Sequence, residues 1–381
     1  MSKYELSISP SYAHQWTFVD AVREIFQNAI DQETTEQDNA MFWRYDESQQ
    51  KLLIGNKRSK LSVRSLLLGE STKQNDTRTI GKFGEGYKIA TLVLLRSDKP
   101  IVFFNYGANE IWKPRFVNSH RYKTQVLTFF VDRQPVWSSV PDHNLTIEIS
   151  NVTADEFEQI VESNLHMQTV ESVLETDYGR ILFDEQYAGQ VYVNGLWVCK
   201  HEAYRYGYDF KPERIKIDRD RKLVSDFDLR WLSSSIWNTV DGHNDQLLDL
   251  VRSNAADTAF LDSTQYLAPM AKRAALRDAA YNSFVEEYGE TVVPVTSQQD
   301  LEAIPSSHTA VIVPENYKKL ITASDHYKAP VAPKPQKRAL DQLVEWFEGV
   351  RFKLSGDEVA VFEATYDQLR KEMKELYDQV F

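Results

Sequence analysis

The stretch Ile80–Arg96, IGKFGEGYKIATLVLLR, constrains the fold more than any other part of this 381-residue chain. Gly81, Gly84 and Gly86 carry no Cβ atom, so the backbone can adopt φ > 0 and a phosphate chain can approach it closely. Apolar residues at helical spacing follow the last glycine: Ile89, Ala90, Leu92, Val93 and Leu95. A glycine loop that leads into a helix offers unpaired N–H groups and the positive end of the helix dipole to an anion. The stretch therefore predicts a phosphate-binding loop before a core helix, with Lys88 as a mobile cation.

The glycine pattern has three alternative interpretations. A dinucleotide fold needs a strand directly before them, but Glu70–Thr79 is polar and is typical of a loop. A P-loop needs four residues between its glycines and then Gly-Lys-Ser/Thr, which this sequence lacks. The remaining alternative is a glycine turn that only caps a core helix.

A second pattern lies upstream, where Thr17 and Asp20 are spaced as a capping pair that opens a helix. Glu24, Asn28 and Asp31 fall on one stripe of that helix. Its buried side is supplied by Phe18, Val22, Ile25, Phe26, Ala29 and Ile30. Most charged stripes are solvated faces, which is the alternative here. Asparagine is a poor helix former, however, so we expect a stripe of this kind between apolar residues to line a site.

Short strands are predicted over the next part of the chain. Met41–Tyr45 and Lys51–Ile54 form a hairpin pattern, and Leu61–Leu68 is typical of a short amphipathic helix. Further strand patterns occupy Ile101–Tyr106, Glu110–Val117, Gln125–Asp132 and Leu145–Ser150. Successive strands without intervening helices indicate an antiparallel or mixed sheet, so we expect an α/β fold. Thr153 with Glu156 predicts the cap of another helix.

Composition excludes several classes of protein. The formal net charge is −12, so DNA contact would need a local basic patch rather than the overall field. The single cysteine, Cys199, rules out an internal disulfide framework and suits a reducing compartment. The sequence has no run near the length of a membrane span, no signal-peptide pattern and no zinc-ligand spacing among its eight histidines. We therefore expect a cytoplasmic protein with no membrane contact.

The order of the motifs resembles that of the GHKL ATPase superfamily, which includes gyrase B subunits, MutL, large heat-shock chaperones, histidine kinases and MORC proteins. The matching elements are E-x-x-x-N-A-x-D, a hydrophobic hairpin, G-x-S-T-K and G-x-F-G-x-G-x-K, over about residues 10–165. The GESTK…IGKFGEGYK stretch is closest in style to MORC proteins and to phage and bacterial relatives. The resemblance implies a Bergerat-type ATP-binding α/β sandwich, whose mixed, mostly antiparallel sheet carries helices on one face.

The resemblance also implies roles for individual residues. Glu24 matches the general base that activates the attacking water, Asn28 matches the Mg²⁺ ligand, and Asp31 matches a residue that structures the pocket. Lys73, in the polar loop Gly69–Thr79 over the glycine site, is a further catalytic and nucleotide-binding candidate. The phosphate box comprises Gly81, Lys82, Phe83, Gly84, Glu85, Gly86, Tyr87 and Lys88. The implied cofactors are ATP and Mg²⁺.

The second box departs from the family pattern, D-x-G-x-G, whose aspartate accepts a hydrogen bond from the adenine amino group. The equivalent stretch here is IGNKRSKLS, which has no aspartate. Asn56 could accept that bond through its amide oxygen, which makes a weaker contact than a carboxylate. Thr146 matches a threonine that often helps to hold the base, although a strand threonine is commonly structural.

Beyond residue 165 the resemblance weakens. Gln190–Lys200 predicts a hairpin around an Asn-Gly turn. Tyr204–Lys222 is rich in basic residues, and in related proteins a basic side chain of a following transducer domain reaches the γ-phosphate. Arg219, Arg221 and Lys222 are the candidates for this contact. Acidic residues alternate with them, so the alternative is a surface ion network.

The predicted organisation has four parts. A nucleotide-binding domain occupies 1–167, and a transducer-like α/β region occupies 168–328. A proline-rich linker at 329–337 precedes a helical module at 338–381. The module has a heptad seam formed by Phe362, Tyr366, Leu369, Met373, Leu376 and Val380.

We expect Mg²⁺-dependent ATP hydrolysis, lid closure and an ATP-dependent homodimer, with the aromatic arm Tyr4–Trp16 crossing between protomers. One alternative is a nucleotide-gated clamp on DNA or on a protein partner, with little hydrolysis. Another is a phosphotransferase, a kinase, which Glu24 at the base position and the lack of a recognisable phospho-acceptor helix disfavour.

Overall fold

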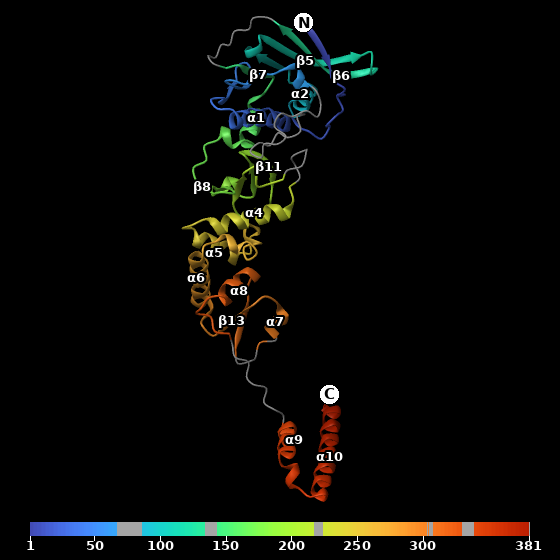
Figure 1. Cartoon of the computed structure of the whole chain (residues 1–381), viewed down its shortest axis with the longest axis vertical. Helices are drawn as coiled ribbons and strands as arrows, with labels where there is room; N and C mark the ends of the chain where they lie inside the picture. The colour runs from blue at the N-terminus through green and yellow to red at the C-terminus, as the bar shows by residue number, and fades with distance from the viewer. Residues whose placement is uncertain are drawn as a thin grey trace. The chain divides into compact units, whose positions relative to one another are not determined.

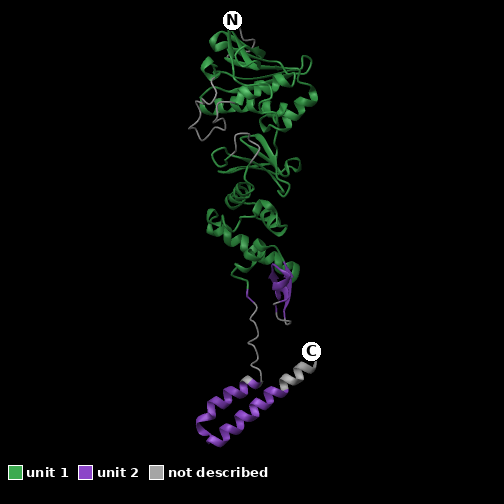
Figure 2. Cartoon of the chain, turned by 90° about the vertical axis from the view of Figure 1, so that its right-hand side faces the viewer, with its two compact units in different colours: residues 1–289, 313–327 green, residues 290–312, 328–381 purple. Residues whose placement is uncertain are grey.

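The structure is a computed structural model that describes residues 1–66, 86–133, 143–216, 224–302, 304, 308–329 and 339–380. The chain is a mixed α/β protein with antiparallel sheets. It divides into two units, one of residues 1–289 and 313–327 and one of residues 290–312 and 328–381 (Figure 2). Over the described ranges, no helix is both long and apolar enough to cross a membrane.

The first sheet has seven strands in the order β1-β6-β5-β4-β7-β3-β2, and every neighbouring pair is antiparallel. The predicted hairpin and the four predicted strands after it are confirmed. The first strand was not predicted. The strands are β1 (Ser2–Glu5), β2 (Met41–Asp46), β3 (Lys51–Asn56), β4 (Ile101–Asn105), β5 (Glu110–Ser119), β6 (Thr124–Arg133) and β7 (Leu145–Ser150).

Two helices, α1 (Phe18–Thr35) and α2 (Gly86–Arg96), pack against each other and lie on the same side of this sheet (Figure 1). Their apolar faces and the inward faces of the strands form one core, because both patterns place apolar side chains on a single face. A third helix, α3 (Ala154–Glu162), begins at the predicted Thr153–Glu156 capping box. The predicted helix at 61–68 is instead a short 3₁₀ turn, η1 (Val63–Leu66), as far as the structure describes it.

The N-terminal arm packs on its own chain. β1 pairs with β6, and the amide of Leu6 donates to the carbonyl oxygen of Leu127 at 2.9 Å. Arg96, the last residue of α2, donates to four carbonyl oxygens of the arm at 3.1 to 3.2 Å: those of Pro10, Tyr12, Ala13 and Trp16. Trp16 is buried. Within one chain, a guanidinium with several donors therefore fixes the backbone of the arm.

The second sheet has five strands in the order β11-β10-β12-β9-β8, of which β10 and β12 are parallel and the other pairs antiparallel. Its strands are β8 (Val173–Glu175), β9 (Gly179–Leu182), β10 (Gln190–Val193), β11 (Leu196–Lys200) and β12 (Gly207–Phe210). The predicted Asn-Gly turn joins β10 to β11, with φ of 50° at Asn194 and 77° at Gly195. Asp209 of β12 holds this turn, since its Oδ1 accepts the Gly195 amide at 2.7 Å.

A helical layer follows the second sheet and comprises α4 (Asp226–Thr239), α5 (Asn244–Arg252), α6 (Met270–Tyr288) and α8 (Glu315–Thr322). Buried polar groups join it to the sheet. Tyr208 donates its hydroxyl to Asp257 at 2.5 Å and accepts the Trp237 indole N–H at 2.8 Å. Burial raises the pKa of Asp257, whose carboxylate also accepts the Arg205 amide at 2.9 Å.

The second unit holds the parallel pair β13 (Val292–Val295) and β14 (Thr309–Ile312), with α7 (Gln298–Glu302) between them. It also holds α9 (Ala339–Val350) and α10 (Gly356–Val380). The predicted heptad seam lies on α10, and Phe362 of that seam stacks on Phe347 of α9 with ring centroids 3.8 Å apart. These two helices therefore pack as a hairpin.

Candidate functional site

The site begins with the capping box that starts α1. The Thr17 amide donates to Asp20 Oδ2 at 2.8 Å, and the Asp20 amide donates to Thr17 Oγ1 at 3.3 Å. This fixes the first turn and therefore the direction of every later side chain on the helix. Glu24 is 1% exposed and Asp31 is fully buried, while Asn28 is half-buried. The stripe is therefore not a solvated face.

Gly86, the first residue of α2, meets this stripe. A Cβ atom on Gly86 would lie 2.4 Å from Glu24 Oε2 and 3.7 Å from Asn28 Nδ2. Only a residue without a side chain allows so close an approach. The structure thus brings Gly86, the last glycine of the glycine motif, next to Glu24 and Asn28, the first two residues of the polar stripe on α1. The N-terminus of α2, where the helix dipole is positive, consequently faces a buried carboxylate and an amide.

The amide of Asn28 is oriented by its own helix. Its Nδ2 donates to the backbone carbonyl oxygen of Glu24 at 2.7 Å, one turn earlier. The amide oxygen is on the other branch of the side chain and is directed away from that carbonyl. An amide oxygen is among the ligands that Mg²⁺ accepts. Asn28 therefore fits the implied metal in the type of its side chain.

Lys88 is in the first turn of α2, as predicted, but it is not exposed. It is fully buried, and its Nζ lies 5.6 Å from the centroid of the Tyr87 ring. The prediction of a mobile cation is wrong because the first turn of α2 packs into the core rather than against solvent. Tyr87 Oη lies 2.5 Å from the Ser65 carbonyl oxygen and 2.9 Å from Ser65 Oγ, and burial raises the pKa of Tyr87. These hydrogen bonds therefore hold the chain at Ser65 and the chain at Tyr87 close together.

Asn56 and Thr146, the candidate base-binding residues, lie on the neighbouring strands β3 and β7. Asn56 is buried, and its Nδ2 donates to the carbonyl oxygens of Ala29 at 2.9 Å and Asn39 at 3.2 Å. Its amide nitrogen is thus committed to holding β3 against the end of α1. Thr146 of β7 is opposite Gly55 of β3. A Cβ on Gly55 would lie 2.1 Å from the Leu145 carbonyl oxygen, so this glycine is required by packing.

Two buried asparagines that the sequence analysis did not identify hold the segment after β3. Asn39 Oδ1 accepts the amides of Arg58 at 2.7 Å and Ser59 at 3.1 Å. Asn105 Oδ1 accepts the Leu61 amide at 3.1 Å, and its Nδ2 donates to the Leu61 carbonyl oxygen at 2.9 Å. Side chains at strand ends thus replace backbone partners for this segment. The only signal in the sequence was that each asparagine flanks a hydrophobic strand.

Arg23, directly before Glu24, connects α1 to the second sheet. Its Nη1 donates to the Trp197 carbonyl oxygen at 3.3 Å and lies 3.7 Å from Asp20 Oδ1. Leu196, the neighbouring residue of β11, is buried in the core of the first sheet and its helices. The Leu165 amide donates to the Gly195 carbonyl oxygen at 2.8 Å. The turn of the β10–β11 hairpin is therefore docked beside the helix that carries Glu24.

The remaining predicted site residues lie outside the described residues. They are Lys73, Gly81, Lys82, Phe83, Gly84, Glu85, Arg219, Arg221 and Lys222. The predicted lid loop Gly69–Thr79 and nearly all of the predicted linker are outside as well.

A comparison with known protein families finds a match outside this site. A family model described as the Mycoplasma pneumoniae MPN635 N-terminal domain matches residues 155–238. That range runs from α3 through all five strands of the second sheet to α4. A curated protein of Mycoplasma pneumoniae (strain ATCC 29342 / M129), named "Uncharacterized protein", is 25% identical over 224 residues, which are 55% of this chain and 86% of that protein. The chain is thus similar to a mycoplasma domain across the second sheet and the helices that flank it.

Proposed function

We propose that this protein binds and hydrolyses ATP in a Mg²⁺-dependent reaction, with residues 1–167 as a GHKL-type domain of the Bergerat fold. The observation that carries the proposal is the approach of Gly86 to Glu24 and Asn28 at the N-terminus of α2. A buried carboxylate beside a glycine-lined helix terminus combines a proton acceptor with an anion site.

The roles of the chain's own residues follow from their positions. Glu24 is placed to orient a water and accept its proton, since its carboxylate lies beside the helix terminus at which phosphates would bind. Asn28 would hold Mg²⁺ through its amide oxygen. The bound ion would supply positive charge to the phosphate oxygens. Gly86, which has no side chain, allows the start of α2 to approach Glu24 closely.

Adenine recognition is proposed to depend on Asn56 and Thr146. Because the Asn56 nitrogen already binds two carbonyl oxygens, its oxygen is the atom that can accept a hydrogen bond from the adenine amino group. That contact lacks a full negative charge, so we expect the discrimination between adenine and other bases to be weaker than with an aspartate.

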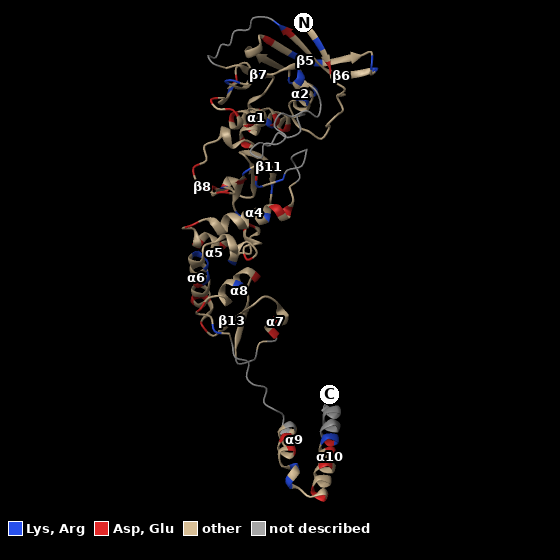
Figure 3. Cartoon of the chain, viewed as in Figure 1, with Lys and Arg blue, Asp and Glu red and all other residues tan. Residues whose placement is uncertain are grey.

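Nucleotide binding is further proposed to order the segment between Ser65 and Tyr87 and to favour a homodimer. The tie between these two residues supports a lid that is anchored at both ends. Acidic and basic residues are interspersed along α4, α5, α6 and α8 (Figure 3), which together with the net charge of −12 favours a protein client over DNA.

The direct test is ATP binding by calorimetry and phosphate release at steady state, both on the full chain with and without Mg²⁺. We expect binding and slow phosphate release, each dependent on Mg²⁺. Incubation with γ-labelled ATP distinguishes the kinase alternative, because a kinase would transfer the label to protein. Binding of ATP without measurable phosphate release would favour the nucleotide-gated clamp.

A further inference from the structure

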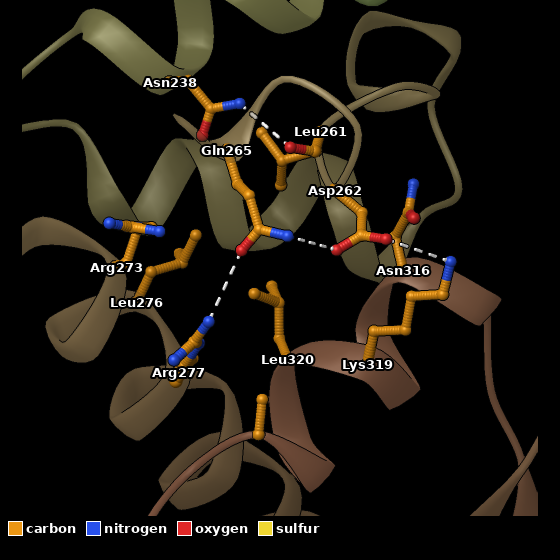
Figure 4. A pocket seen from close by; sticks show the side chains of 11 residues that line it. Asn238, Leu261, Asp262, Gln265, Arg273, Leu276, Arg277, Asn316, Lys319 and Leu320 are labelled. Carbon is orange, nitrogen blue, oxygen red and sulfur yellow. Dashed lines mark hydrogen bonds and ion pairs between the residues drawn. The ribbon is translucent and has the colours of Figure 1, made fainter. Parts of the chain in front are cut away.

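A partly open pocket with an internal volume of about 100 Å³ lies in the helical layer, apart from the residues of the candidate ATP site (Figure 4). Its walls are α4, α6, α8 and the segment 261–265. The apolar part of the lining is formed by Leu261, Leu276, Leu320 and Ala323. A volume of this order is several times that needed for one water molecule, so the partly open pocket can hold the apolar part of a small ligand.

The walls are held in place by buried hydrogen bonds. Asn238 Nδ2 donates to the Leu261 carbonyl oxygen at 2.9 Å and to Thr264 Oγ1 at 2.8 Å. Asn316 Nδ2 donates to the Thr258 carbonyl oxygen at 2.9 Å, which joins α8 to the chain just before the segment 261–265. The walls of the pocket are therefore ordered before a ligand binds, and binding does not carry the entropic cost of ordering them.

Two guanidinium groups contribute to one side. Arg273 and Arg277 are four residues apart on α6 and so lie on one face of that helix. The Nε atom of Arg273 is buried and has no hydrogen-bond partner among the residues that the structure describes. Arg277 Nη2 lies 3.4 Å from Gln265 Oε1, beyond the usual length of such a bond. Among the residues that the structure describes, neither arginine pairs with a carboxylate, so both retain donors for an anion.

The acidic residue of the pocket is already matched. Asp262 accepts the Gln265 side-chain amide at 2.8 Å and lies 3.3 Å from Lys319 Nζ. Lys319 is also 3.0 Å from Glu315, and these two carboxylates raise the pKa of the lysine. Figure 4 shows the resulting row of contacts from Arg277 through Gln265 and Asp262 to Lys319. The positive charge left over is that of the two arginines, in a chain whose net charge is −12.

We propose that this pocket binds a small ligand that has an apolar body and one carboxylate, with the carboxylate on Arg273 and Arg277. A guanidinium matches a planar carboxylate with two parallel hydrogen bonds. The leucines favour an apolar body, because burying it removes apolar surface of both partners from water. A phosphate ion would satisfy the arginines but would leave the leucines uncovered.

The test uses octanoate as ligand and titrates it into the full chain by calorimetry, with octan-1-ol and inorganic phosphate as comparisons. We expect octanoate to bind, octan-1-ol to bind about tenfold or more weakly for lack of the charge, and phosphate not to compete. Phosphate binding equal to that of octanoate would overturn the requirement for an apolar body. Equal binding of octan-1-ol would overturn the requirement for a carboxylate.

Variants of the lining residues test whether octanoate binds in this pocket. The double variant Arg273→Gln/Arg277→Gln should weaken octanoate binding about tenfold or more, whereas Arg252→Gln, which removes one positive charge from an exposed residue of α5, should not change it. Leu320→Trp should abolish octanoate binding by filling the pocket, with the circular dichroism spectrum unchanged. Octanoate binding that survives both the double variant and Leu320→Trp would contradict the proposal, as would no binding by the wild type.

Discussion

Glu24 Oε2 lies 2.4 Å from the position that a Cβ atom on Gly86 would occupy. A methyl group there would have to displace either the carboxylate or the start of α2. Both belong to the proposed ATP site, so adding a single methyl group at position 86 tests the geometry.

Gly86→Ala should therefore lower ATP affinity at least about tenfold and destabilise the fold by about 1–3 kcal/mol through overpacking. The matched control is Gly349→Ala in α9, where an added Cβ meets nothing within 4 Å. Calorimetric titration with ATP and chemical unfolding of both variants give the two quantities. An alanine variant at position 86 with wild-type ATP affinity would show that the close approach has no part in binding.

The contact between Arg23 and Trp197 should transmit nucleotide binding to the second sheet. In the wild type, we expect ATP to slow hydrogen exchange of the β10–β11 hairpin, because its turn is docked beside the helix that carries Glu24. Arg23→Ala should retain ATP binding and lose this protection, whereas Arg44→Ala on the exposed side of β2 should keep it. If the Arg23 variant retains full protection of the hairpin, the contact does not transmit the signal.

Tyr208 links Asp257 and Trp237 through one hydroxyl group. Tyr208→Phe leaves a buried carboxylate and a buried indole N–H each without this partner, which should lower the free energy of unfolding by about 2–4 kcal/mol. Tyr266→Phe, at an exposed tyrosine, is the control and should change it little. Urea titration followed by tryptophan fluorescence measures both, and a loss below about 0.5 kcal/mol for Tyr208→Phe would argue against the network.

Lys272 caps the end of α4 and should produce a pH dependence. Its Nζ donates to the carbonyl oxygens of Trp237 at 2.8 Å, Asn238 at 3.0 Å and Val240. Burial lowers its pKa from 10.5 to about 8, although Asp241 acts in the opposite direction. Between pH 8 and 10.5 the unfolded chain therefore binds more protons at this residue than the folded chain, so the Lys272 contribution to stability rises with pH in that window.

Lys272→Met should lose this rise of stability with pH. Below pH 8 the variant should still be less stable than the wild type, because the carbonyl oxygens at the end of α4 lose their donor. The measurement is the difference in unfolding free energy between the two proteins at several pH values from 7 to 10, for which we expect a gap that widens with pH. A gap independent of pH would mean that Lys272 keeps its ordinary pKa in the folded protein.

Local patterns in the sequence predicted much of the fold. The capping pairs at Thr17 and Thr153 begin helices where expected, because both partners of each cap lie within one turn. The Asn194–Gly195 turn was predicted for the same reason, since the two residues alone determine the backbone conformation. The strands after α2 followed from their alternating apolar pattern.

The errors concern contacts between distant residues. β1 exists because it pairs with β6 and because Arg96 binds the arm, and neither partner is near in sequence. The burial of Lys88 depends on how α2 packs, which its spacing does not determine. The roles of Asn39 and Asn105 depend on the path of the segment after β3. For the candidate site, the sequence predicted that Glu24, Asn28 and Gly86 belong together, although only the folded chain gives their separation.

The measurement that tests the central claim most directly compares ATP binding and ATP hydrolysis in Glu24→Gln, which keeps the shape of the side chain and removes its basicity. We expect ATP affinity to remain near that of the wild type, while the rate of phosphate release falls by about two to four orders of magnitude. The control is Glu33→Gln, an exposed residue of the same helix, which should hydrolyse ATP at the wild-type rate. Equal hydrolysis by Glu24→Gln and the wild type would contradict the assignment of Glu24 as the general base, and absence of ATP binding by the wild type would contradict the proposed function itself.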